Sequence, residues 1–464
     1  MERSMSDDQP TLFGRPIDRR DLLKLTGKVL AGGALAGMWL SPELASYVEA
    51  AATGRASGGS VSVMSQYSPP GPGKWKSYFA AFTRETGITV NLEDVVYNNQ
   101  YQKIATQGQG GVAGYDVVAI DTIWSGSFGG AGFTLDLSNF LPPAVQKQIA
   151  PAALSSVSYK GKMYGVPAYN SSKHFYYNKT MLSQVGLHRP PATLTEMVSY
   201  CEILKRNKAK LGIQYPMSAP WAQAENLTCD FVDLVGATGG RFYASDNATP
   251  NFDKTSGVQT LQLMKMLLDK GYMAPGSLTH TGGETEDDLL GGKTVMCTRW
   301  EGVMADSRNP ALAVASVRGN IRLALIPGSA GRKSGACLGP EGWAIMKSST
   351  HQTEAKAFLN WWVSRSAQKQ GMVMFDQFPI YSSMYADPEL RQLAKKADGV
   401  DDFALYGEQF NYAQARPNFP GYLAASGRLQ ANLQKGLLGQ ETARKAIDAA
   451  AAEMKTAVGS GSNP

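Results

Sequence analysis

The sequence has few of the residues that build metal, redox or cofactor sites. Its 464 residues include only four histidines and four cysteines. The cysteines (Cys201, Cys229, Cys297 and Cys337) lie far apart, and none has the C-x-x-C spacing of a zinc ribbon or a thioredoxin-type centre. We therefore expect no metal ion and no cofactor. Four cysteines allow three disulfide pairings, and the sequence does not choose among them.

Charge is also scarce. Charged residues make up 18% of the chain, against ~25% in a typical soluble protein, and the net charge is only +6. The densest basic run is Lys205-Arg206-Asn207-Lys208, which is too short for the basic stripe of a nucleic-acid-binding surface. We expect no nucleic-acid partner. The hydrophobic content of 43% is typical of a globular protein, and the length favours two or three domains.

The N-terminal region has the pattern of an export signal. Paired arginines, Arg19-Arg20, precede a Gly- and Ala-rich apolar stretch from Val29 to Leu40, and small residues cluster up to Ala52. A charged start, a weak apolar stretch and a small-residue cleavage site are typical of a cleavable peptide of the twin-arginine type. The apolar stretch is interrupted well before the ~20 residues that a membrane span needs. We predict that residues 1–52 are removed on export to the periplasm.

No cysteine precedes Cys201, so we expect no lipid anchor on an N-terminal cysteine. The rest of the chain contains no apolar run of membrane-spanning length. We therefore expect the mature protein to be free in the periplasm.

The mature chain alternates strand and helix patterns. Apolar residues alternate or cluster as in strands, and recur at helical spacing between them. The expected order is strand 60–67, helix 75–82, strand 88–92, helix 97–107 and strand 115–120. This order predicts an α/β sheet with right-handed crossovers.

The α/β pattern continues through the middle of the chain. Thr193 and Glu196 form a capping box that opens a helix. Further along we expect a helix at 258–268, strands at 294–296, 321–326 and 343–346, and a C-terminal third that is almost entirely helical.

Motifs of catalysis are almost absent. The chain contains no H-E-x-x-H, P-loop or G-x-S-x-G sequence. The stretch Gly108–Ala113 loosely matches a dinucleotide loop, but it follows a helix instead of a strand. Glu284, Glu286, Asp287 and Asp288 are better explained as the acid-rich first turn of a helix than as a calcium loop.

Tryptophans, by contrast, follow strands or lie beside glycines. Trp124, Trp221 and Trp300 have this placement, whereas Trp343 lies inside an expected strand and is more typical of a core. Ligands of α/β sheets bind beyond the carboxyl ends of the strands. Flat rings beside carboxylates and amides suit sugars, because the CH faces of a sugar stack while its hydroxyls need polar partners.

Several motifs together resemble one protein family, the maltose-binding (family 1) type of extracellular solute-binding proteins. Each motif is weak alone, but they occur in the family's order and span roughly residues 60 to 455. The motifs are Lys160–Pro167 with Tyr177-Asn178-Lys179, Gly186-Leu187 with Pro190–Thr193, Gly292–Met296 with Trp300, Gly339–Ser348, Ala355–Ser364, Asp387–Leu390 and Arg416-Pro417.

The resemblance implies an α/β fold of two lobes, each a central sheet flanked by helices, joined by crossover strands and closing on a solute by a hinge motion. It places residues 57–167 and 340–378 in the N-terminal lobe, and residues 171–337 and 383–464 in the C-terminal lobe. The implied protein is a monomer that binds without catalysis. It delivers a small solute, most simply a carbohydrate, to the permease of an ABC importer.

Site residues follow from the same resemblance. Aromatic rings are expected to stack on the solute, carboxylates to accept its hydroxyls, and an arginine to donate. The implied residues are Tyr67, Asp121, Trp124, Trp221, Trp300, Glu301, Glu341, Arg416 and Tyr422. The chain departs from the family at Pro379-Ile380-Tyr381, where many sugar-binding members have an arginine, and at Tyr422-Leu423-Ala424-Ala425, where some have an aromatic pair. We therefore expect fewer ligand contacts at these two places.

Two alternatives stay open. The same fold can bind a non-sugar solute: a polyamine site would surround the amine with carboxylates, and an anion site would offer arginine and helix N-termini. A secreted carbohydrate-active enzyme would instead use a pair such as Glu301 and Glu341 as its two catalytic carboxylates.

Overall fold

The computed structural model describes residues 11–12, 15–16, 59–65, 72–112, 114–246, 249–398 and 402–461. The predicted export signal lies outside the described residues, apart from the short strands β1 (Thr11–Leu12) and β2 (Arg15–Pro16). Tyr67 is also outside the described residues. No helix in the described part of the chain is both long and apolar enough to cross a membrane.

The chain divides into two compact units. Unit 1 comprises residues 1–170 and 340–397, and unit 2 comprises residues 171–339 and 398–464. Unit 1 therefore includes residues 383–397, which the sequence analysis assigned to the C-terminal lobe. The contacts explain this placement, because Lys369 of unit 1 forms ion pairs with Asp387 at 2.9 Å and with Glu389 at 3.1 Å.

Unit 1 contains a five-stranded mixed sheet in the order β4-β3-β5-β13-β8. Its strands are β3 (Ser60–Ser65), β4 (Thr89–Asp94), β5 (Val117–Asp121), β8 (Val166–Tyr169) and β13 (Glu341–Ile345). The first three are parallel, as the strand–helix alternation predicted. Strand β13 is antiparallel to both β5 and β8, which that alternation did not indicate. It enters the sheet only after the chain has passed through unit 2, so no short crossover fixes its direction.

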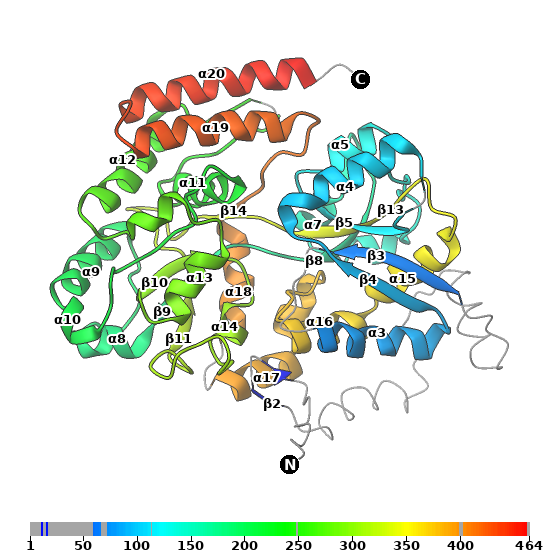
Figure 1. Ribbon diagram of the computed structural model, residues 1–464, viewed down its shortest axis with the longest axis horizontal. Coiled ribbons are helices and arrows are strands. Elements are labelled where there is room, and N and C mark those ends of the chain that lie inside the picture. Colours follow the sequence, from blue (N-terminus) through cyan, green and yellow to red (C-terminus); the bar gives the residue numbers. More distant parts are fainter. Residues whose placement is uncertain are drawn as a thin grey trace, which may run out of the picture. The chain divides into compact units, whose positions relative to one another are not determined.

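Helices cover both faces of this sheet (Figure 1). On one side lie α3 (Pro72–Thr86), α15 (Gln352–Trp362) and α16 (Arg365–Phe375); on the other lie α4 (Tyr97–Gly110) and α5 (Ser125–Gly130). The remaining elements are α6 (Pro143–Gln146), α7 (Pro151–Ser156), β6 (Ser158–Tyr159), β7 (Lys162–Met163), η3 (Ser382–Ala386) and α17 (Pro388–Asp398).

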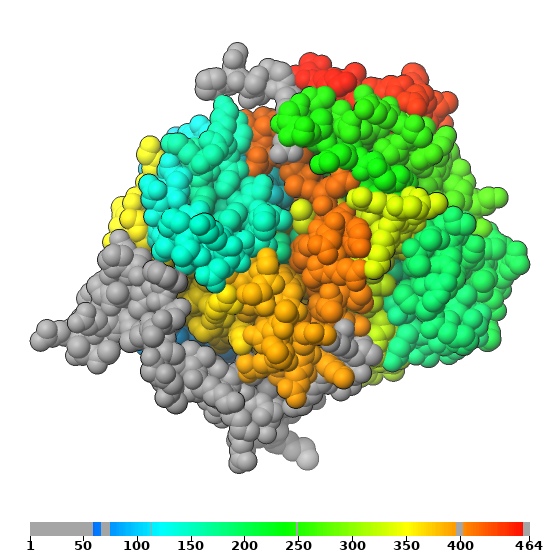
Figure 2. Space-filling view, turned by 180° about the vertical axis from the view of Figure 1, so that it is seen from behind, coloured from blue at the N-terminus to red at the C-terminus, as the bar shows by residue number. Residues whose placement is uncertain are grey.

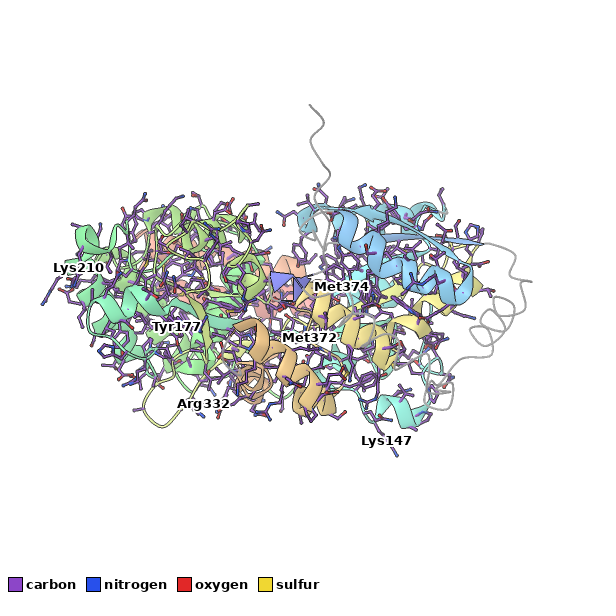
Figure 3. The ribbon with its side chains drawn as sticks, turned by 90° about the horizontal axis from the view of Figure 1, so that it is seen from below. Lys147, Tyr177, Lys210, Arg332, Met372 and Met374 are labelled. Carbon is purple, nitrogen blue, oxygen red and sulfur yellow. The ribbon has the colours of Figure 1, made fainter. Side chains whose placement is uncertain are left out.

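Aromatic rings make the core beneath α3. The expected apolar face of this helix brings Trp75 against Phe375 at 4.4 Å and Tyr78 against Trp361 at 4.9 Å between ring centroids. Trp343 is fully buried and lies 4.9 Å from another core ring, so it is the core residue that its place in a strand indicated. Met372 and Met374 of α16 are buried in the same unit (Figure 3).

Unit 2 is built on a three-stranded antiparallel sheet in the order β10-β9-β11. The strands are β9 (His174–Asn178), β10 (Met296–Arg299) and β11 (Ile321–Ala324). A separate two-residue ladder pairs β12 (Ala336–Cys337) with β14 (Ala413–Gln414).

Most of unit 2 is helical. Its helices are α8 (Lys179–Gln184), α9 (Leu194–Arg206), α10 (Lys208–Leu211), α11 (Glu225–Ala237), α12 (Thr255–Asp269), η2 (Pro275–Leu278), α13 (Gly283–Leu290), α14 (Val303–Asp306), α18 (Phe403–Gln409), η4 (Phe410–Tyr412), α19 (Tyr422–Leu437) and α20 (Ala443–Gly461).

Helices α19 and α20 lie side by side (Figure 1), and α20 forms part of the outer surface of unit 2 (Figure 2). Lys210 of α10 lies at the outer edge of the same unit (Figure 3), where its ammonium donates to the carbonyl of Gln184 at 2.7 Å.

The start of α9 confirms the predicted capping box. The Thr193 hydroxyl accepts a hydrogen bond from the backbone N–H of Glu196 at 3.1 Å. The Glu196 carboxylate accepts in turn from the N–H of Ala192 at 2.7 Å, and it is paired with Arg189. Because the Arg189 side chain and then the Ala192 N–H donate to the ionised carboxylate, the pKa of Glu196 falls to about 2.

Candidate functional site

Two acidic residues stand side by side at one end of the unit 1 sheet. Asp121 is the last residue of β5, Glu341 is the first residue of β13, and the strand register places them directly opposite each other. Opposite residues of an antiparallel pair point to the same face, with Cβ atoms roughly 4.5–5.5 Å apart. Both side chains are buried. The structure thus brings together two of the predicted site residues, which lie 220 positions apart in the chain.

Tyr97 joins this strand end and was not anticipated. It is the first residue of α4, directly beyond the carboxyl end of β4, and its hydroxyl donates to Asp121 Oδ2 at 3.0 Å. The second oxygen of Asp121 accepts from the backbone N–H of Ile123 at 3.0 Å. The Asp121 carboxylate is therefore held in one orientation. A tyrosine opening a helix just after a strand was the available sequence signal.

Trp124 lies beneath Tyr97. The two rings stack with centroids 5.2 Å apart and planes 21° apart. Trp124 is 2% exposed, whereas Tyr97 is only half-buried. The ring at the surface of this stack is therefore Tyr97, and Trp124 supports it from below.

In unit 2, Trp300 follows strand β10 and is held on several sides. Its indole Nε1 donates to Asn226 Oδ1 at 3.1 Å, and its backbone carbonyl accepts from the Tyr176 hydroxyl at 3.1 Å. Gly339 lies against the ring: a Cβ atom at position 339 would come within 2.5 Å of Trp300 Cζ3. The ring itself is half-buried. The sequence predicted a ring at this strand end, and the structure adds the three residues that fix it.

Glu301 adjoins the tryptophan. Its Oε2 accepts a hydrogen bond from the Ser171 hydroxyl at 2.7 Å. Burial raises the pKa of Glu301 to about 7, since the Ser171 hydrogen bond offsets only part of the cost of removing the carboxylate from water. Near neutral pH the side chain can therefore present either a protonated or an ionised carboxyl to a hydroxyl group.

Arg299, the residue before Trp300, is paired with a carboxylate of unit 2. Its guanidinium donates to Glu286 Oε2 at 2.7 Å, and both side chains are largely buried. Glu286 is in the first turn of α13, which confirms that the acidic run of this region opens a helix.

Trp221 lies in the hydrophobic core of unit 2. It is 2% exposed, and its indole N–H donates to Asp230 Oδ2 at 2.9 Å. The same Asp230 pairs with the ammonium of Lys173, which also lies 3.5 Å from Asp233 Oδ2. The ring of Trp221 is thus packed away from solvent, with its one donor already satisfied.

Arg416 and Tyr422 are gathered around one carboxylate, Glu225. Arg416 donates to Glu225 Oε1 at 2.9 Å, and the Tyr422 hydroxyl donates to the same oxygen at 2.8 Å. The other oxygen of Glu225 accepts from Ser426 at 2.6 Å and from Gln430 at 3.2 Å. Arg416 and Tyr422 are buried, so this cluster joins α11 to α19 inside unit 2.

Five of the predicted site residues lie at or near strand ends, in two separate groups. Asp121, Glu341 and Trp124 are in unit 1, and Trp300 and Glu301 are in unit 2. Within the described ranges, no three His, Cys, Asp or Glu side chains are grouped to hold a metal ion.

Comparison with known proteins gives the family. The family described as "Bacterial extracellular solute-binding protein" matches residues 77–397. A "Probable ABC transporter-binding protein" of Deinococcus radiodurans is 26% identical over 345 residues, which are 73% of this chain and 78% of that protein. A "Mannitol-binding protein" of Pseudomonas aeruginosa is 25% identical over 280 residues, 60% of this chain and 62% of that protein.

Solved structures agree on the fold. A maltose-bound T. maritima protein, MalE3, superposes with a TM-score of 0.74 at 23% identity and covers 86% of this chain and 99% of that one. An ABC transporter solute-binding protein from Agrobacterium radiobacter, in complex with ribitol, gives a TM-score of 0.72 at 23% identity, with 86% and 98% covered. These likenesses confirm the predicted two-lobed α/β fold. The family match covers more than half of the residues of this chain, and the chain therefore belongs to the bacterial extracellular solute-binding protein family.

Proposed function

We propose that the protein is the receptor of an ABC importer and that its solute is a sugar or sugar alcohol. Relatives named as ABC transporter-binding and mannitol-binding proteins support this assignment, as do the maltose and ribitol in the related structures. The observation that carries it is the setting of Trp300. A half-buried ring is held by Asn226 and Gly339, and the next residue in the chain, Glu301, accepts a hydrogen bond from Ser171 through its carboxyl group.

This setting suits a polyol better than an ion. An indole face takes the CH groups of a sugar, and a neighbouring carboxyl binds its hydroxyls. Unit 1, taken by itself, has a ring and a carboxylate of the same kind in Tyr97 and the oriented Asp121. Of the predicted residues, we keep Asp121, Trp124, Trp300, Glu301 and Glu341, with Trp124 as the support of Tyr97. We leave out Trp221, Arg416 and Tyr422 because core contacts account for them; the role of Tyr67 stays a prediction.

A cationic solute is the second candidate. The adjacent carboxylates of Asp121 and Glu341 in unit 1 suit an ammonium group. An anionic solute is less well supported, because Arg299 and Arg416 of unit 2 are each paired with a carboxylate, Glu286 and Glu225 respectively.

The test is a screen of unliganded protein against maltose, mannitol, ribitol, putrescine and sulfate by thermal shift and calorimetry. Ligand at 100-fold excess over its Kd stabilises the folded state by ~2.7 kcal/mol. Such a gain raises the unfolding midpoint by roughly 5–10 °C. A shift with a sugar or polyol alone supports the proposal. A shift with putrescine alone, or with sulfate alone, assigns the other solute class.

Export and assembly form part of the same proposal. We infer that Arg19 and Arg20 direct the precursor to a twin-arginine route and that the mature receptor works as a periplasmic monomer. Its partners are the solute and the permease subunits of the importer. Its role is binding without catalysis, and hinge closure on the solute stays a prediction from the family resemblance.

A further inference from the structure

The ammonium group of Lys173 lies over the ring of Trp300. The distance from Lys173 Nζ to the ring centroid is 5.9 Å, within the range of a cation–π interaction. The Lys173 side chain is 0% exposed, whereas Trp300 is half-buried. The ring face toward Lys173 is therefore turned to the core of unit 2, and the part of the ring that solvent reaches lies away from the ammonium.

One face of helix α11 holds both the ring and the ammonium. Asn226, Asp230 and Asp233 follow one another at helical spacing, so they lie on the same face of α11. Asn226 accepts the hydrogen bond of the indole N–H at 3.1 Å. Asp230 and Asp233 both pair with the Lys173 ammonium, and the Asp233 oxygen lies 3.5 Å from it. A single stretch of helix thus fixes the tryptophan at its edge and fixes the cation over its face.

The backbone brings Lys173 and Gly339 to the ring together. Residues 171–173 run antiparallel to residues 337–339 and are joined to them by two hydrogen bonds, one of 3.0 Å from the N–H of Gly339 and one of 3.2 Å from the N–H of Lys173. Gly339 packs on the six-membered part of the ring, where a Cβ atom would come within 2.5 Å of Trp300 Cζ3. The ring is therefore held by both chains of this pairing and by α11.

Stability alone does not account for a charged group at this place. Removing three charges from water is expensive, and replacement of a whole buried ion group by well-packed apolar side chains is often neutral or stabilising. An apolar residue at position 173 would therefore fill the same space at lower cost. What the ammonium adds is a fixed direction, because Asp230 and Asp233 hold it on one side and the indole face takes it on the other.

We propose that Lys173 is a positioning residue of the solute site: its ammonium holds the Trp300 ring from the core side, and the solute stacks on the opposite face. The inference rests on the proposed function, since it takes Trp300 as the ring that meets the sugar or polyol. It adds that the plane of the ring is set before the solute arrives. A side chain that is already ordered loses less conformational entropy on binding, so the preset ring increases affinity.

The experiment is a double-mutant cycle of Lys173→Met and Trp300→Ala, titrated by calorimetry with whichever of maltose, mannitol and ribitol binds the unaltered protein best. Titrations are made well below the unfolding midpoint, so that they report on folded protein. Lys173→Met should weaken binding by roughly 5- to 30-fold, the size of a desolvated cation–π contact. In the Trp300→Ala background the same change should alter affinity by less than about twofold, because the ring through which Lys173 acts is gone.

Leu433→Ala is the matched control. Leu433 of α19 is fully buried in the core of unit 2, so its truncation should destabilise the fold to a similar extent but leave affinity unchanged. Loss of affinity from Lys173→Met that is equal with and without the Trp300 ring, or no loss in either background, would overturn the positioning role and leave the proposed function intact. If none of the three solutes binds the unaltered protein, the proposed function fails and this inference fails with it.

A second variant guards against misfolding. Lys173→Met combined with Asp230→Asn and Asp233→Asn removes all three charges together and leaves no unpaired carboxylate in the core. It should show the same loss of affinity. If neither variant folds, a crystal structure of the unaltered protein with the bound solute decides. Solute carbons against the Trp300 face away from Lys173 Nζ support the proposal, whereas a solute on the same face as the ammonium, or away from the ring, overturns it.

Discussion

Lys173 and Asp230 form an ion pair in the core of unit 2, with their side chains only 0% and 4% exposed. Asp233 completes the group, 3.5 Å from the Lys173 ammonium. Burial raises the pKa of Asp233 to about 6, even though Lys173 acts in the opposite direction. One buried cation thus serves two buried carboxylates, and one of these also binds Trp221.

Removing that cation should be costly. Lys173→Met leaves two carboxylates in the core without their partner, and breaking a buried pair in this way costs ~3–5 kcal/mol. The free energy of unfolding should fall by that amount in urea titrations. The matched control is Lys369→Met in unit 1, whose partners Asp387 and Glu389 are partly exposed. It should cost ~1 kcal/mol or less. Equal losses in the two variants would show that the Lys173 group contributes no more than a surface pair.

Glu301 should make stability depend on pH. Its pKa is about 7 in the folded protein and ~4.3 in an unfolded chain, because burial favours the protonated form. Between these values the folded state binds more protons, so the Glu301 contribution to the unfolding free energy decreases as pH rises from about 4 to about 7. Glu301→Gln should remove this decrease.

The pH dependence of the unfolding free energy must be compared between Glu301→Gln and the unaltered protein, because other groups also make stability depend on pH. His174, with a pKa lowered to about 3 by burial, acts in the opposite direction, since the unfolded chain binds its proton first as pH falls. The difference in unfolding free energy between Glu301→Gln and the unaltered protein isolates Glu301. A difference that stays constant from pH 4 to pH 7 would contradict the raised pKa.

Tyr97 should matter for binding more than for stability. Tyr97→Phe keeps the stack on Trp124 but removes the hydroxyl that orients Asp121. A hydrogen bond to a charged group contributes ~1.5–3 kcal/mol. If binding requires the oriented Asp121, solute affinity should fall roughly 10- to 150-fold. The control is Tyr115→Phe, which loses a 2.8 Å hydrogen bond to the exposed Glu93 and should leave affinity unchanged. Equal affinities in both variants would remove the unit 1 strand end from the proposed site.

Export should depend on the arginine pair. Arg19 and Arg20 precede an apolar stretch broken by Gly32 and Gly33. With both arginines changed to lysine, we expect the precursor to stay uncleaved in the cytoplasm, as seen by blotting of cell fractions. Normal processing of the double variant would argue against the twin-arginine route.

Local patterns predicted the elements well because the signals are local. The capping box at Thr193, the apolar face of α3 and the three parallel strands of unit 1 each depend on residues a few positions apart. The antiparallel direction of β13 does not depend on neighbouring residues, because the chain passes through unit 2 before β13 joins the sheet.

The candidate site shows the same limit. The positions of Trp300 after β10 and of Asp121 at the end of β5 could be predicted, because the strand patterns that place them are local. Arg416 and Tyr422 could not be assigned, because their partner Glu225 lies 191 and 197 residues away in the chain. Trp221 and Asp230 are only nine residues apart in the chain. However, no sequence pattern shows whether the indole N–H of a tryptophan donates to a core residue or to a ligand.

The most direct test of the proposed receptor function is calorimetric titration of Trp300→Ala with the best sugar or polyol of the screen, alongside urea denaturation without solute. Because the ring is half-buried and we propose that it stacks on the solute, affinity should fall by ~1–3 kcal/mol, or roughly 5- to 150-fold, while unliganded stability changes little. Trp221→Ala is the control and should lose ~3–5 kcal/mol of stability, as a core residue does. A Trp300→Ala protein that loses stability as Trp221→Ala does, yet binds the solute unchanged, would contradict the account.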